Sequence, residues 1–88
     1  YVITSNRESG FGRYDVVLEP LGDSDDAIIL EFKVCGQDGR DTLADTVQEA
    51  LNQIERMKYS AALEAKGIPK RRIRKYGFAF EGKTVLIG

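Results

Sequence analysis

Two ionisable residues interrupt an apolar segment and have the types and spacing of a cation-binding site. Glu31 and Lys33 stand in the otherwise apolar run 27–35, and their i, i+2 spacing places both side chains on one face of a strand. Burying a carboxylate and an ammonium costs several kcal/mol per ion unless they are paired or bind something, so a purely structural strand favours Val or Ile there. A partly buried Glu31–Lys33 ion pair is the alternative interpretation.

Strand register adds a third candidate, Asp15, from the predicted strand 13–19. If this strand forms an antiparallel hairpin with 27–33 in which Arg13 faces Lys33, then Asp15 faces Glu31. Directly opposed residues have Cβ atoms about 4.5–5.5 Å apart, so the two carboxylates can converge on one cation. Carboxylates supplemented by water suit Mg²⁺ or Mn²⁺, with the Phe32 backbone carbonyl as a candidate third ligand.

The elements that must position these residues can be predicted from periodicity and turn signals. Strands are expected at 1–4, 13–19, 27–35, 73–80 and 84–87. Apolar residues at three- and four-residue steps predict one long amphipathic helix over 43–66, opened by a capping box at Thr42–Asp45 and stopped by Gly67 and Pro69. The expected order is β-β-β-α-β-β, which predicts an α/β fold built on a mixed β-sheet flanked by a helix.

A strand that is apolar on both faces, like 27–35, needs cover on both sides of its sheet. One helix covers one face. The sequence therefore predicts that something else covers the other face, and there are two alternatives. A first flanking helix would precede Tyr1 in a longer protein, of which these residues are a C-terminal fragment, or the chain would form a homodimer.

Composition bounds the chemistry further. The 88 residues, 42% hydrophobic and 31% charged, fit one small domain, residues 1–88. No apolar run approaches the ~20 residues needed to span a bilayer, and the N-terminus does not resemble a signal peptide, which predicts a cytoplasmic protein with no membrane partner.

Histidine is absent, which excludes Ser-His-Asp catalysis and HExxH zinc sites. Cys35 is the single cysteine and is expected in the core.

Together these residues resemble a known family. Asp15, followed by Glu31-Phe32-Lys33 and then a long helix, is similar to the D…(D/E)xK core of the PD-(D/E)XK nuclease superfamily. The segments 6–15 and 28–33 resemble the branch of predicted bacterial nuclease domains at the C-terminal end of proteins with an AAA-type ATPase region. The resemblance implies a restriction-endonuclease-like fold and an ATPase region in the same full-length chain.

The resemblance also implies roles. Asp15 and Glu31 would bind a divalent metal, and Lys33 would orient the attacking water or stabilise the transition state of phosphodiester hydrolysis. Gln53 resembles an auxiliary polar residue of some branches, although the sequence departs from their QxxxY pattern because Met57 stands four positions on. An exposed helix residue is the alternative for Gln53. The superfamily's further acid on an N-terminal helix is missing, and Glu8 either substitutes for it or pairs with a nearby arginine.

Charge is distributed unevenly along the chain. Residues 1–50 carry eleven acids against four bases, whereas 51–88 carry nine bases against three acids. The densest basic stretch is either a solvated face or a contact for nucleic-acid phosphates, and Arg13 either contacts a phosphate or neutralises the facing acids. The candidate nucleic-acid-binding residues, with DNA as the expected polymer, are Arg13, Lys70, Arg71, Arg72, Arg74 and Lys75.

Residues 77–84 match the phosphate-loop expression GxxxxGK[ST]. The expected context is a strand and a hairpin turn rather than a strand and a helix, so this match is rejected. Two function classes remain: a magnesium- or manganese-dependent nuclease, and a catalytically inactive nuclease-like module for interaction or regulation in an ATPase-containing protein.

Overall fold

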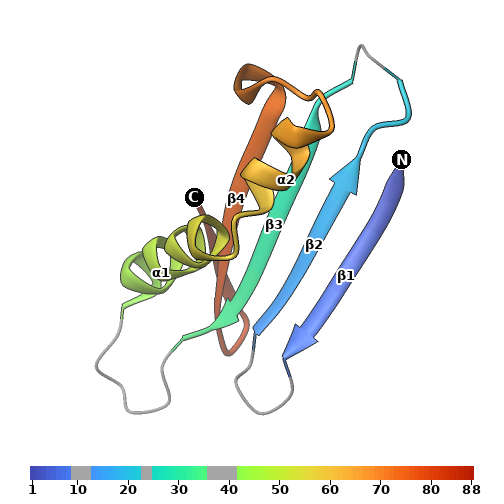
Figure 1. The fold of residues 1–88 in the computed structure, drawn as a ribbon. Helices are drawn as coiled ribbons and strands as arrows, with labels where there is room; N and C mark the ends of the chain where they lie inside the picture. The colour runs from blue at the N-terminus through green and yellow to red at the C-terminus, as the bar shows by residue number, and fades with distance from the viewer. Residues whose placement is uncertain (9–12, 23–24, 36–41) are drawn as a thin grey trace.

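The computed structural model describes residues 1–8, 13–22, 25–35 and 42–88. In these residues, five strands form one mixed sheet with spatial order β1-β2-β3-β4-β5 (Figure 1). The strands are β1 (Val2–Glu8), β2 (Arg13–Glu19), β3 (Ala27–Val34), β4 (Ile73–Glu81) and β5 (Thr84–Ile87). The first three strands are antiparallel, β4 runs parallel to β3, and β5 returns antiparallel to β4. The predicted mixed α/β fold is confirmed.

The parallel connection between β3 and β4 carries the helices α1 (Leu43–Arg56) and α2 (Tyr59–Ala65), then the 3₁₀ turn Lys70–Arg72. The predicted capping box is present: the Asp45 amide donates to Thr42 Oγ1 at 3.1 Å, and the Thr42 amide donates to Asp45 Oδ2 at 3.5 Å. Such a cap stabilises a helix by about 1 kcal/mol. The capping box therefore sets the start of α1 at Leu43, as predicted from the sequence.

The prediction of one helix over 43–66 is wrong, because the helix breaks between α1 and α2. Lys58 adopts a left-handed conformation with φ of 58°, which cannot continue a right-handed helix. The break turns Leu63 into the core, where it packs with Ile54 of α1 and with Ala27 and Ile29 of β3. Periodicity could not reveal this turn, because Ala61 and Ala65 fit a continuous apolar stripe although both are exposed.

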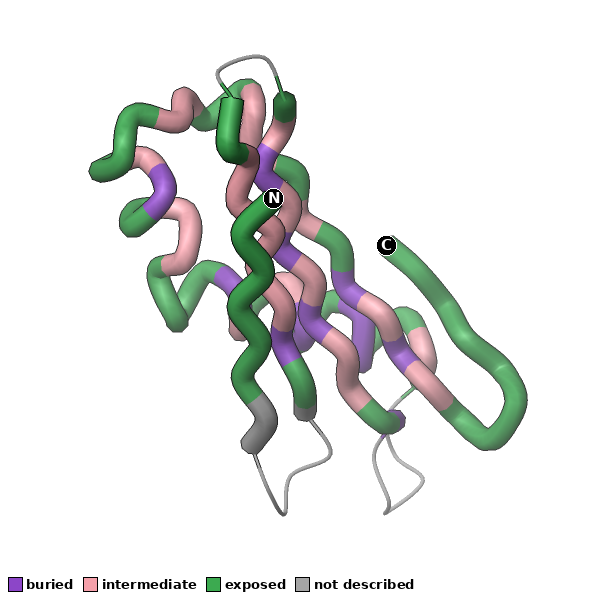
Figure 2. The backbone as a smooth tube through the Cα atoms, turned by 90° about the vertical axis from the view of Figure 1, so that its right-hand side faces the viewer, coloured by how far each residue is buried: buried purple, intermediate pink, exposed green. Residues whose placement is uncertain are grey.

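Both helices lie on one face of the sheet (Figure 1). Gly77 of β4 sets how closely α1 approaches: a Cβ there would lie 2.9 Å from the Val47 carbonyl oxygen and 3.1 Å from Ala50 Cβ. Burial is accordingly concentrated in the middle of the sheet and under α1, while the outer strands β1 and β5 are exposed (Figure 2). The helices therefore cover the face of the sheet that carries Glu31 and Lys33.

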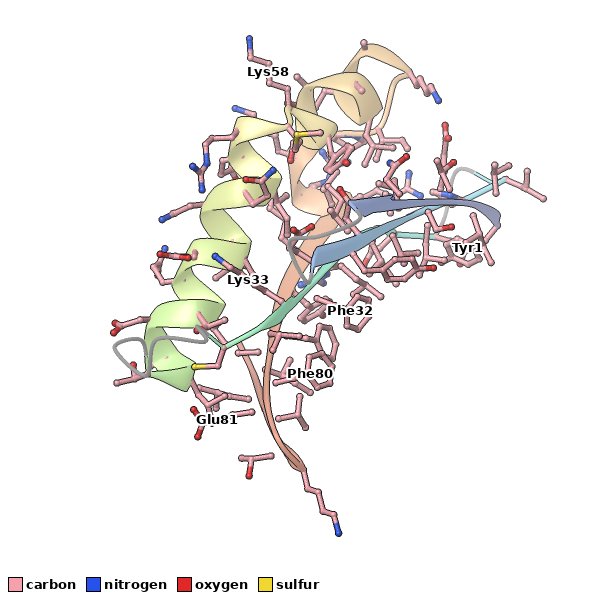
Figure 3. All side chains as sticks on the ribbon, turned by 90° about the horizontal axis from the view of Figure 1, so that it is seen from below. Tyr1, Phe32, Lys33, Lys58, Phe80 and Glu81 are labelled. Carbon is pink, nitrogen blue, oxygen red and sulfur yellow. The ribbon has the colours of Figure 1, made fainter. Side chains whose placement is uncertain are left out.

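The opposite face carries a row of aromatic rings. Phe32 stacks against Phe78 with ring centroids 4.7 Å apart, and Phe80 and Tyr14 lie at 6.1 and 5.9 Å from the same ring. Figure 3 shows Phe32 and Phe80 on the side of the sheet away from the helices. No helix of the described residues covers this face, in agreement with the prediction from β3.

The segment that matches the phosphate-loop expression is a strand, a turn and a strand. Gly82 takes a left-handed φ of 58° in the turn between β4 and β5, and no helix follows it. The rejection of a phosphate-binding loop there is confirmed. No helix within the described ranges is long and apolar enough to cross a membrane.

Candidate metal centre

Asp15 and Glu31 stand directly opposite each other in the β2–β3 ladder. The predicted register is confirmed: Arg13 pairs with Lys33 and Val17 with Ile29 in the same ladder. Both carboxylates are withdrawn from solvent, since Asp15 is 8% and Glu31 is 1% exposed. Two facing acids at this depth repel each other unless a cation, a proton or a hydrogen-bond donor compensates them.

The two acids line a small cleft of about 30 Å³ beneath the junction of α1 and α2. A cleft of this size holds only a few water molecules, so it suits a small ion or water rather than an organic ligand. Its other lining residues come from β1, β2, the two helices and the break between them, and they are Asn6, Tyr14, Gln53, Met57 and Tyr59.

Tyr59, the first residue of α2, reaches the site directly. Its hydroxyl donates to Asp15 Oδ2 and accepts a hydrogen bond from Asn6 Nδ2 at 3.5 Å. The pKa of Tyr59 is raised to about 12, first by burial and then by its hydrogen bond to Asp15 and the charge of that carboxylate, whereas the Asn6 bond opposes the rise. The phenol is therefore neutral at physiological pH and acts as a donor to Asp15.

Lys33 forms an ion pair with Glu49 of α1. The Lys33 side chain is 26% exposed and that of Glu49 is 47% exposed, so the pair lies at the solvent-facing side of the gap between β3 and α1. Figure 3 shows Lys33 on the helix side of the sheet, the side opposite Phe32. Lys33 thus shares a face with Glu31, as their spacing predicts, but its ion-pair partner is Glu49 of α1.

Gln53 is half-buried and lines the same cleft as Asp15 and Glu31. This position favours the predicted site role over the alternative of an exposed helix residue, and the role itself remains a prediction. Arg13 begins β2 opposite Lys33, and Glu8 ends β1. The side chains of Arg13 and Glu8 lie outside what the structure describes.

Several residues of the predicted basic stretch form ion pairs within the domain. Arg72 and Arg74 pair with Asp26, at 3.9 and 3.1 Å, and Lys75 pairs with Glu55 of α1. Lys70, Arg74 and Lys75 line another groove, of about 640 Å³, which shares no residue with the cleft. Lys70 and Arg71 are exposed. Phosphate contacts by Arg72, Arg74 and Lys75 would therefore require these ion pairs to exchange partners.

The donor set fits a hard divalent cation. Two buried, opposed carboxylates supply negatively charged oxygen ligands, and Mg²⁺ is commonly held by one or two carboxylates together with water. Phe32 lies between Glu31 and Lys33 on β3. A carbonyl oxygen has two lone pairs, so the Phe32 carbonyl can accept a hydrogen bond in the ladder and still serve as the predicted metal ligand. Among the described residues, no cluster of three or more His, Cys, Asp or Glu side chains gathers at one point.

Sequence reasoning missed Tyr59, Asn6 and Glu49. A continuous helix over residues 43–66 does not predict that the Tyr59 side chain contacts Asp15. Asn6 was missed because the expected strand ended at residue 4, whereas β1 extends to Glu8 and places Asn6 directly beside Asp15. Glu49 follows Lys33 by sixteen positions, and nothing in the local pattern signals their contact.

A five-stranded mixed sheet with helices in its parallel crossover, and with an aspartate facing an ExK tripeptide on the next strand, defines the class of nuclease-like α/β domains. The family model described as PD-(D/E)XK nuclease superfamily matches residues 1–88. The chain belongs to this superfamily, and its fold is restriction-endonuclease-like, as predicted. No curated protein and no solved structure matches the chain significantly.

Proposed function

We propose that residues 1–88 form a divalent-metal-dependent nuclease domain that hydrolyses phosphodiester bonds in nucleic acid, with DNA as the expected polymer. The observation that supports this most strongly is the pair of buried carboxylates, Asp15 and Glu31, opposed in one ladder beside Lys33. A fold alone supports many functions, whereas a buried like-charge pair requires a specific compensation.

Each residue has a distinct part in this proposal. Asp15, Glu31 and the Phe32 carbonyl hold Mg²⁺ or Mn²⁺. When bound, the cation activates water as a nucleophile and offsets the negative charge that develops on the phosphate. Lys33 supplies positive charge to the same phosphate or orients the water. Its pair with Glu49 is partly exposed and therefore weak, so a substrate phosphate can replace that carboxylate. Gln53 contributes a polar contact from α1.

The basic residues are proposed to bind the substrate backbone rather than to read its sequence. Lys70 and Arg71 are exposed, and the ion pairs of Arg72, Arg74 and Lys75 are exchangeable with phosphates. Arg13, the first residue of β2, belongs to the same proposed set of phosphate-binding residues. Each phosphate contact on duplex DNA adds about −0.9 to the slope of log affinity against log salt, so replacing one contact should reduce that slope.

The deciding experiment is metal-dependent cleavage by matched variants. Single- and double-stranded DNA and RNA are incubated with the protein in Mg²⁺ or Mn²⁺ and, as a control, in EDTA. We expect cleavage that is lost in Asp15→Asn, Glu31→Gln and Lys33→Met. Glu81→Gln and Lys83→Met change the same residue types at exposed positions near the β4–β5 turn and should cleave normally. Cleavage by the site variants at the normal rate would refute the proposal.

A second candidate is an inactive nuclease-like module that mediates interaction or regulation. The face that carries Phe32, Phe78 and Phe80 favours it, because these rings are half-buried with no helix of the described residues over them, and a partner that packs there would bury them further. The expected partners are a second copy of the chain or another part of an ATPase-containing protein. Metal binding without cleavage of any of the four polymers would support this candidate.

A further inference from the structure

The break between α1 and α2 places a left-handed residue directly before the site. Lys58 is the one residue other than glycine with positive φ in the described part of the chain. This conformation costs about 1–2 kcal/mol for a residue that has a Cβ, and it persists only where surrounding contacts compensate for it. The contacts that compensate here should be those made by the residues immediately after the break.

Tyr59 makes such contacts in two directions. Its ring packs against the core cluster that contains Ile54 and Leu63. Its hydroxyl donates to Asp15 Oδ2 and accepts from Asn6 Nδ2. The ring is therefore anchored in the core while the hydroxyl contacts the carboxylate.

The partners of Tyr59 lie in one row across the sheet. Asn6 pairs with Asp15 in the β1–β2 ladder, and Asp15 pairs with Glu31 in the β2–β3 ladder. Hydrogen bonds from a side-chain amide to the phenol, and from the phenol to the carboxylate, therefore run toward Glu31. Tyr59 engages one oxygen of Asp15, Oδ2, and this bond restricts how the carboxylate can rotate.

We propose that Tyr59, held by Asn6, is a positioning residue that orients the Asp15 carboxylate for binding a divalent cation. This inference rests on the proposed function, because it assumes that Asp15 is a metal ligand. A carboxylate that binds metal is usually hydrogen-bonded in turn, and loss of such a partner typically weakens metal affinity or activity about 10–100-fold. The left-handed conformation of Lys58 then matters for the site, because the helix break that it makes allows the Tyr59 hydroxyl to reach Asp15.

The test measures Mn²⁺ affinity without substrate, by electron paramagnetic resonance or calorimetry. Tyr59→Phe removes the hydroxyl and keeps the ring, so the core contact is preserved. We expect Mn²⁺ affinity to fall about 10–100-fold in Tyr59→Phe and by a smaller factor in Asn6→Ala. Tyr76→Phe is the matched control, because Tyr76 is exposed on β4, and its affinity should equal that of the wild type. Thermal unfolding in EDTA establishes that each variant folds.

The outcomes separate this inference from the proposed function. Asp15→Asn is measured in the same series. If Asp15→Asn loses Mn²⁺ binding while Tyr59→Phe binds within twofold of the wild type, the positioning role is refuted and the metal site stands. If Asp15→Asn binds Mn²⁺ normally, the metal site itself is refuted. Should Tyr59→Phe fail to fold, Asn6→Ala decides, and wild-type affinity in that variant would refute the positioning role.

Discussion

Asp15 and Glu31 occupy directly opposed positions on β2 and β3, and both side chains are buried. Their mutual repulsion is a cost to the metal-free fold that bound metal would remove. We predict that Glu31→Gln raises the free energy of unfolding in EDTA by about 0.5–2 kcal/mol, the range of common stabilising substitutions. Thermal or urea unfolding measures this change.

Addition of Mn²⁺ should reverse the order of stability. A cation that binds only the folded protein stabilises it by RT ln(1 + L/Kd), where L is the concentration of free cation, so the wild type, which should bind more tightly, should gain more than Glu31→Gln. Glu81→Gln, an exposed substitution, should respond to metal as the wild type does. A lower melting temperature for Glu31→Gln than for the wild type in EDTA would contradict the placement of repulsion at this pair.

The Lys33–Glu49 pair joins β3 to α1 at a partly exposed position. Exposed ion pairs contribute about 0–1 kcal/mol, because water screens them and two flexible side chains must be fixed. A double-mutant cycle with Lys33→Met and Glu49→Gln should therefore give a coupling free energy below about 1 kcal/mol that decreases as NaCl is raised. A coupling well above this value, insensitive to salt, would mean that the pair is desolvated and holds α1 to the sheet.

Gly77 provides a test of helix packing over the site. A Cβ at this position would lie 2.9 Å from the Val47 carbonyl oxygen, closer than side chains tolerate. We predict that Gly77→Ala lowers the free energy of unfolding by about 1–3 kcal/mol, the usual cost of overpacking. Gly22→Ala is the control, because no atom lies within 4 Å of a Cβ there. Equal stability of the two variants would show that α1 can move away from β4 without loss.

The carboxylate pair was predictable because a single choice of strand register determines it. Once Arg13 faces Lys33, Asp15 must face Glu31, and the alternation of side chains puts both acids on one face. The apolar residues of β3 on both faces likewise predicted a second apolar face beyond the one under the helix, and Phe32 and Phe80 lie on that face. These features follow from a periodicity of two residues, which local sequence expresses directly.

The helix break and the contacts around it could not be predicted in the same way. Ala61 and Ala65 continue the apolar stripe of α1, so local pattern favours one helix, whereas burial of Leu63 and Tyr59 against the sheet favours the turn at Lys58. Tertiary packing decided the outcome. The contact of Tyr59 with Asp15 depends on that packing, and the contact of Lys33 with Glu49 depends on how α1 packs on the sheet; sequence spacing contains no signal for either.

Tyr59 makes the stability of the fold depend on pH in the alkaline range. Tyr59 has a pKa of about 12 in the folded protein against 10.0 for an unperturbed tyrosine, with burial as the largest cause and the Asp15 hydrogen bond next. The folded state therefore keeps this proton at pH values where the unfolded chain releases it. By linkage, the stabilisation is fully present below pH 10 and is lost as pH rises from about 10 to about 12.

Tyr59→Phe isolates this contribution from the other groups that titrate at high pH, because those groups are shared. Urea unfolding in EDTA at intervals between pH 9 and about pH 12 should show wild-type stability falling more steeply than that of Tyr59→Phe, by up to the slope that one proton produces. Tyr76→Phe should retain the wild-type slope. Parallel curves for the wild type and Tyr59→Phe would show that the Tyr59 proton is held no more tightly in the folded protein than in the unfolded chain.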